Sequence, residues 1–174
     1  MKTIVTALVL VFVSAAAFGQ IVQIPTMQSC NIGKASGSAN VYLSKRQDIN
    51  SAGTIDITVN NVGCDPINGD GYPTGTISMR FSLTDSTISD MQVTQIEQMT
   101  TVGKHTTTTY LSGRCTANGG TIPCHFWLNL ADNRVPSLPG TPDVVGVLVV
   151  DKKGNTLTYG TGPVKTGDVS VTQF

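Results

Sequence analysis

The four cysteines offer the most definite chemistry in the sequence. They are Cys30, Cys64, Cys115 and Cys124, and an even number of cysteines in an exported chain predicts two disulfides. Four cysteines allow three pairings. The Asn-Gly-Gly sequence at 118–120 favours a tight turn that brings Cys115 to Cys124, which leaves Cys30 for Cys64. The loop-entropy model assigns about 4 kcal/mol to the longer bridge and about 2.6 kcal/mol to the shorter one.

Oxygen-bearing side chains just after Cys64 are typical of either a calcium loop or a turn. Asp65, Asn68 and Asp70 stand in a glycine-containing segment, the pattern with which a calcium loop folds its oxygens around one ion. Pro66, however, occupies the place of the first acidic ligand, and Asn, Asp, Gly and Pro are also the usual turn residues. We therefore expect a plain turn, with a calcium site as the alternative and no other cofactor.

Three aromatic side chains, Trp127, Tyr110 and Tyr72, are candidates for stacking against a ligand ring. The segment 122–130 alternates so that Cys124 and Phe126 share one face of a strand and Trp127 takes the other. A tryptophan exposed in this way would be placed to stack on a sugar ring or on a partner molecule. The alternative is a tryptophan buried between two sheets.

The sequence holds none of the short motifs that mark common catalytic sites. It has no Gly-x-Ser-x-Gly elbow, no zinc-protease helix motif and no phosphate-binding loop. His125 follows Cys124, but neighbours on a strand point to opposite faces, so these two residues do not predict a nucleophilic thiol. We therefore expect a protein that is not an enzyme. A secreted hydrolase with an aspartate pair assembled from distant loops is the remaining alternative.

The elements that must position these residues are predicted to be β-strands. The segment 143–162 predicts two strands joined by a tight turn, and residues 144–150 are apolar on both faces, which predicts a strand covered on both sides. Further strands are predicted by alternation at 39–43, 54–60, 76–83 and 122–130. Eight or nine short strands without a convincing helix predict an all-β fold, a single immunoglobulin-like antiparallel β-sandwich. A closed β-barrel is the alternative.

The first 19 residues have the three-part pattern of a secretory signal peptide. Lys2 precedes an apolar run at 7–13, and small residues lead to Gly19. Cleavage there leaves residues 20–174 as one domain, which we expect outside the cell, at the cell surface or in the periplasm. No later segment is apolar over the roughly 20 residues that a membrane-spanning helix requires, so no membrane span is expected.

Part of the chain resembles the chaperone–usher pilins and the spore-coat-U domains, which are secreted bacterial β-sandwiches. In those families an early cysteine is bridged to one that closes the next strand, as Cys30 and Cys64 would be around the segment 54–59. The segment 145–154 is also similar to a pilin hairpin. The resemblance implies a sandwich fold and a structural role at the cell surface.

The composition narrows the class of partner. Charged residues make up 13% of the chain and balance at 11 basic against 11 acidic, so we expect no nucleic-acid binding. The leading prediction is a secreted, non-enzymatic protein that acts in cell-surface adhesion, self-association or structural packing. Its partner is a surface polymer or a protein, other copies of itself included. The alternative is a module that binds carbohydrate or a small ligand through Trp127, Tyr110 and Tyr72.

Overall fold

The computed structural model describes residues 33–45, 48–64, 72–103, 107–133 and 140–173. The predicted signal peptide, Cys30 and the candidate calcium ligands Asp65, Asn68 and Asp70 lie outside these residues. Every regular element within them is a strand, which confirms the all-β prediction. The strands are β1 (Gly33–Lys45), β2 (Asp48–Gly63), β3 (Thr74–Leu83), β4 (Asp90–Val102), β5 (Thr107–Ala117), β6 (Ile122–Asp132), β7 (Val144–Asp151) and β8 (Thr156–Gln173).

The eight strands form a closed antiparallel barrel, the alternative to the expected immunoglobulin-like sandwich. Each strand pairs with the next along the chain, and β8 pairs back with β1 from Gly33↔Gln173 to Ser44↔Thr161. A sandwich leaves two sheets with free edges, whereas this closure removes the edges. The sandwich prediction is therefore corrected to a barrel.

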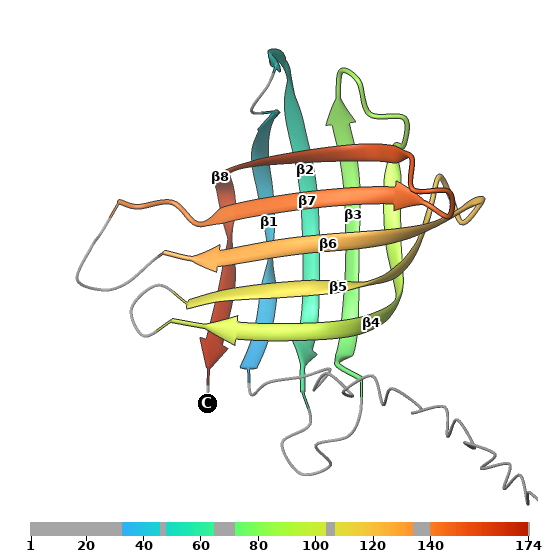
Figure 1. Cartoon of the computed structure of the whole chain (residues 1–174). Coiled ribbons are helices and arrows are strands. Elements are labelled where there is room, and N and C mark those ends of the chain that lie inside the picture. The colour runs from blue at the N-terminus through green and yellow to red at the C-terminus, as the bar shows by residue number, and fades with distance from the viewer. Residues whose placement is uncertain (1–32, 46–47, 65–71, 104–106, 134–139, 174) are drawn as a thin grey trace, which may run out of the picture.

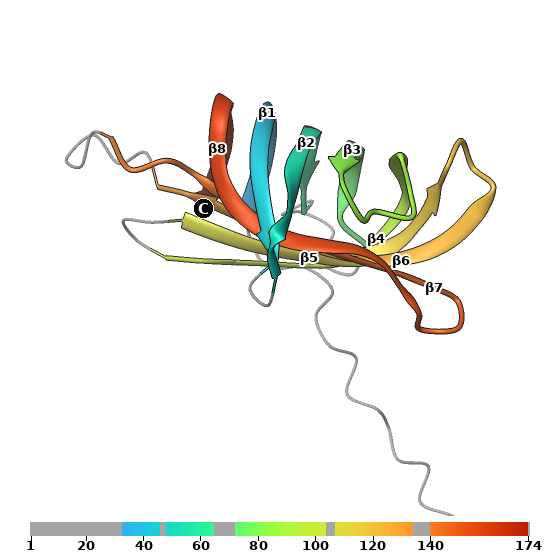
Figure 2. The ribbon, with the colours of Figure 1, turned by 90° about the horizontal axis from the view of Figure 1, so that it is seen from above.

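Strand β8 makes the closure possible because it belongs to both walls of a flattened barrel. Its first part pairs with β7 and its second part with β1, so it bends from one wall into the other (Figure 1). At Gly162 a Cβ atom would overlap the carbonyl oxygen of Tyr42, so glycine permits the close approach of β8 to β1. In Figure 1, β4 to β7 run across the direction of β1 to β3, and Figure 2 shows the two walls facing each other.

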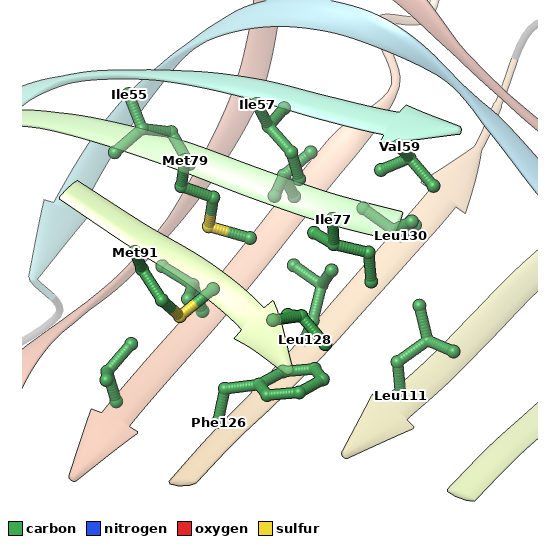
Figure 3. Close-up of a cluster of buried hydrophobic side chains, with 14 of the residues drawn as sticks. Ile55, Ile57, Val59, Ile77, Met79, Met91, Leu111, Phe126, Leu128 and Leu130 are labelled. Atoms are coloured by element: carbon green, nitrogen blue, oxygen red, sulfur yellow. The ribbon is translucent and has the colours of Figure 1, made fainter. Parts of the chain in front are cut away.

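Side chains from both walls meet in the barrel interior. Figure 3 shows Met79 of β3 and Met91 of β4 in the same buried cluster as Phe126 and Leu128 of β6. Phe126 is fully buried, and both methionines are nearly so. In an eight-stranded barrel the interior is just wide enough for side chains to fill it. Alternate residues of each strand therefore face one shared core, a pattern that a sandwich produces equally well.

Strand β7 differs from its sequence-based prediction on its outer face. Val145, Val147 and Val149 are buried in the core, as expected. Gly146 and Leu148 point outward and are only partly buried, so the predicted cover over the second face of β7 is wrong for the described residues. The result is apolar surface on the outside of the barrel.

The two predicted hairpin turns are confirmed. In the β7–β8 turn, Asp151 Oδ1 accepts hydrogen bonds from the backbone N–H groups of Lys153 (2.7 Å) and Asn155 (2.9 Å), and Gly154 has a φ of +84°. In the β5–β6 turn, Thr121 N–H donates to the carbonyl oxygen of Asn118 at 3.4 Å. No helix in the described residues is long and apolar enough to cross a membrane.

The pairing between β3 and β4 is the shortest in the barrel. It consists of three residue pairs, Ser78↔Gln92, Met79↔Met91 and Arg80↔Asp90. Beyond these pairs the two strands diverge, and β4 carries two bulges. The barrel wall therefore has its fewest strand pairs at this β3–β4 seam. A hollow on the outer surface lies there, and the core residues Met79 and Met91 contribute to its lining.

Candidate functional site

A shallow hollow on the outer face of β5, β6 and β7 brings two of the predicted aromatic residues together. Tyr110 and Trp127 are 51% and 49% exposed, and both line a cavity of about 290 Å³ with Leu148, Asn129 and Gly146. We call this the aromatic hollow. The three strands that carry it lie side by side in one wall (Figure 1). Of the two positions that the sequence left open for Trp127, the structure has the exposed one and not the buried one.

Regular strand pairing fixes the positions of these side chains. Strands β5 and β6 pair over eleven residues without a shift in register, and β6 pairs with β7 over eight. Trp127 consequently lies directly opposite Leu148, and Asn129 lies opposite both Tyr110 and Gly146. Cross-strand neighbours of this kind have Cβ atoms about 5 Å apart, so the aromatic rings border the same depression.

The floor of the aromatic hollow combines missing bulk with an unused polar group. Gly146 has no side chain, which lowers the floor beside its register partner Asn129. Asn129 Oδ1 is buried and has no hydrogen-bond partner among the described residues. Buried polar atoms usually have a partner, so an unsatisfied amide beside two exposed rings requires an explanation.

The third predicted aromatic residue lies elsewhere. Tyr72 is 60% exposed and stands just before β3, and it lines neither of the hollows described here. Sequence analysis missed Leu148, Asn129 and Gly146. The sequence carries two signals for these residues. One is the apolar second face of the 144–150 strand, for which the prediction is a covered face. The other is the outward position of Asn129, two residues after Trp127.

A second hollow, of about 620 Å³, lies at the seam between β3 and β4. Its charged residues are Asp56 of β2, Arg80 of β3 and Asp90 of β4, which are direct neighbours in the strand register. Thr58, Ser78 and Gln92 form a parallel neutral row beside them. We call this the polar hollow.

Hydrogen bonds hold the carboxylates of the polar hollow in place. The Gly119 N–H (2.9 Å) and the Ser89 hydroxyl (2.8 Å) donate to Asp90 and lower its pKa below the ordinary 3.8, and the Arg80 guanidinium lowers it further. Asn40 Nδ2 donates to Asp56 Oδ1 at 2.7 Å. Among the described residues, the Arg80 guanidinium makes no side-chain hydrogen bond or ion pair, and its charge acts on Asp90 at longer range.

The cysteines serve structure in this protein. Cys115 and Cys124 face each other across β5 and β6 and form the predicted disulfide, with their Cα atoms 4.9 Å apart. Cys64 is also disulfide-bonded, and its predicted partner Cys30 lies outside the described residues. Among the residues that the structure describes, no group of three or more His, Cys, Asp or Glu side chains could hold a metal ion.

The chain was compared with protein-family models, with curated proteins and with solved structures, and none of them matches it.

Proposed function

We propose that this protein is a secreted, non-enzymatic binding protein that attaches to carbohydrate at a cell surface through the aromatic hollow. The observation that carries the proposal is the pair of half-exposed rings, Tyr110 and Trp127, which both neighbour Asn129 in the same depression. A sugar ring has an apolar C–H face that stacks on an aromatic ring and an equatorial rim of hydroxyl groups. Asn129 is the amide in the lining of an otherwise apolar depression, and its Oδ1 has no hydrogen-bond partner among the described residues.

Physical considerations support a ligand on this face. Exposed tyrosine and tryptophan side chains that gather around a depression are costly to leave in water and are typical of binding surfaces. The rings are held by an unbroken ladder of strand pairs, so little entropy is lost when a ligand binds. The Cys115–Cys124 bridge is consistent with an oxidising compartment, which supports export.

The hydrolase alternative would draw on the carboxylates of the polar hollow, Asp56 and Asp90. A glycosidase needs one carboxyl group that stays protonated near neutral pH, which requires a raised pKa. The pKa of Asp90 is lowered by the hydrogen bonds from Gly119 and Ser89, so Asp90 is unsuited to the role of general acid.

The test is affinity electrophoresis of the mature protein through gels that contain neutral polysaccharides. The panel would include hydroxyethyl cellulose, xylan, laminarin, galactomannan and glycol chitin. We expect at least one polymer to retard the wild-type protein, and Trp127→Ala to weaken the binding at least tenfold, about 1.4 kcal/mol. Tyr72→Ala is the matched control, because it removes an equally exposed aromatic side chain outside the hollow.

Two results would contradict the proposal. One is a wild-type protein that no polymer retards, and the other is a Trp127→Ala variant that is retarded as strongly as the wild type. Thermal unfolding of the variant should stay close to that of the wild type, because Trp127 lies outside the core.

Self-association is the second candidate function, favoured by apolar surface that continues past the hollow. Leu148 lies opposite both Trp127 and Tyr159 in the strand register, and Tyr159 is 37% exposed. This row of Trp127, Leu148 and Tyr159 would also pack against the same face of a second copy of the chain. Light scattering after gel filtration separates the two functions: a concentration-dependent dimer that Trp127→Ala abolishes, without polysaccharide binding, would favour self-association.

A further inference from the structure

We infer that the ligand is a linear oligosaccharide of several rings. The reason is that the outer face of β5 runs from the aromatic hollow to the polar hollow, so that the two hollows form the ends of one elongated binding surface, which we call the track. The inference rests on the proposed function and deepens it. It assigns the polar hollow as a second sugar subsite, in which the charged row of Asp56, Arg80 and Asp90 binds hydroxyl groups.

The track is continuous because β5 and β6 pair without a bulge from Thr107↔Asp132 to Ala117↔Ile122. Leu111 and Cys115 face the core, while Tyr110 and Thr116 lie on the opposite, outer side. Thr116 is the sixth residue after Tyr110, which corresponds to about 20 Å along a strand. Thr116 lies directly opposite Gln92, which lines the polar hollow. The two hollows are therefore the ends of one stretch of surface.

Several side chains between the hollows form hydrogen bonds with one another. Ser112 donates to Gln98 Oε1 at 3.3 Å, and Arg114 Nε donates to Glu97 Oε1 at 2.6 Å. These residues follow Tyr110 along the same outer face, on β5 and its neighbour β4. Amide, hydroxyl and guanidinium groups match the alternating donors and acceptors of a sugar chain.

The charge of the polar hollow selects a neutral polyol over an anion. Arg80 lies between two carboxylates in the register, so a phosphate or sulfate would meet net negative charge. Sugar hydroxyl groups donate to carboxylates and accept from a guanidinium, and hydrogen bonds with one charged partner are about twice as strong as neutral ones. The carboxylates are already oriented by Asn40 and Gly119, which reduces the entropy lost on binding.

The experiment measures affinity against chain length by isothermal titration calorimetry, with two-ring and six-ring oligosaccharides of the polymer that retards the wild type. For the wild type, we expect the six-ring ligand to bind at least tenfold more tightly than the two-ring ligand. The double variant Asp56→Ala/Arg80→Ala should lose this gain and keep its affinity for the two-ring ligand. Its net charge is unchanged, and both residues are exposed, so folding should be preserved.

The remaining measurements separate this inference from the function on which it rests. Gln92→Ala removes a neutral group of the polar hollow, and it should weaken six-ring binding by about threefold. Lys165→Ala, which removes an exposed cation of β8, is the matched control and should change nothing. Two results would overturn the track. In one, the wild type binds the six-ring ligand no more tightly than the two-ring ligand. In the other, the double variant binds the six-ring ligand as tightly as the wild type does. In either case a loss of two-ring binding in Trp127→Ala would leave the proposed function standing.

Discussion

The aromatic hollow and the polar hollow both lie on the outside of the barrel, the first on the wall of β5 to β7 and the second where β2 and β3 meet β4, and they are built in opposite ways. The aromatic hollow stands on the most regular part of the barrel, where β5, β6 and β7 pair without a shift. The polar hollow lies at the least regular part, where β3 and β4 share three residue pairs. In the aromatic hollow, a regularly paired sheet carries the exposed aromatic rings. In the polar hollow, the charged side chains lie where two strands are paired over only a short length.

This difference teaches how a small barrel with a packed interior can bind a ligand. Phe126, Met79 and Met91 occupy the inside, so the side chains that point outward are the ones left for recognition. Apolar recognition needs a rigid platform, because exposed rings contribute most when binding does not have to order them. Polar recognition tolerates an irregular seam, because hydrogen bonds from Asn40, Gly119 and Ser89 orient its carboxylates.

The largest expected effect comes from filling the aromatic hollow without touching the core. At Gly146 a Cβ atom would lie 3.4 Å from Thr161 Oγ1 and 3.7 Å from Asn129 Cβ, which are ordinary contact distances. Gly146→Val should therefore fold and gain up to about 1 kcal/mol of stability from the strand preference of valine. It should abolish binding of the two-ring oligosaccharide in calorimetry.

The control for Gly146→Val is Thr161→Val, which places the same side chain at the adjacent outer position of β8. It lies outside the lining of the hollow and should bind like the wild type. If Gly146→Val folds and still binds the two-ring ligand, the aromatic hollow is not the binding site.

A smaller effect, on stability alone, should follow the loss of the disulfide that lies beneath the track. Cys115 and Cys124 are buried on the core side of β5 and β6. Cys115→Ala/Cys124→Ala should lower the free energy of unfolding by about 2.6 kcal/mol in urea titrations. Two-ring binding should be unchanged, because the strand ladder holds Tyr110 and Trp127 without the bridge. A folded variant with weakened two-ring binding would show that the rings depend on the disulfide.

The smallest expected effect is a pH dependence of stability that comes from Asp90 in the polar hollow and has no counterpart in the aromatic hollow. The pKa of Asp90 is lowered in the folded protein, so its stabilising contribution is present above 3.8 and is lost as the pH falls through the lower folded value. Asp90→Asn should be less stable than the wild type near pH 7, and the difference should shrink between about pH 5 and about pH 3. Chemical denaturation across this range is the measurement.

The aromatic hollow provides the internal reference for the pH experiment. Its lining residues include no carboxyl or imidazole group, so two-ring binding should stay constant while the protein remains folded. A stability difference between Asp90→Asn and the wild type that does not change with pH would contradict the role of the Asp90 hydrogen bonds.

Much of the local structure could be predicted from the sequence, because it depends on near neighbours in the chain. Alternation placed Trp127 and Phe126 on opposite faces, and the Asn-Gly-Gly turn paired Cys115 with Cys124. The export signal, the pilin and spore-coat-U resemblance and the calcium alternative stay predictions.

The sequence by itself determined the strands, their inward and outward faces and the local disulfide, since hydrophobic period and turn chemistry act over a few residues. Only the tertiary structure decided between barrel and sandwich, because that choice depends on β8 reaching β1, more than a hundred residues away in the chain. The same holds for both hollows. Gly146, Asn129 and Trp127 meet through pairing across strands, and so do Asp56, Arg80 and Asp90. The register that joins them follows from closure of the whole barrel, and no local pattern in the sequence encodes it.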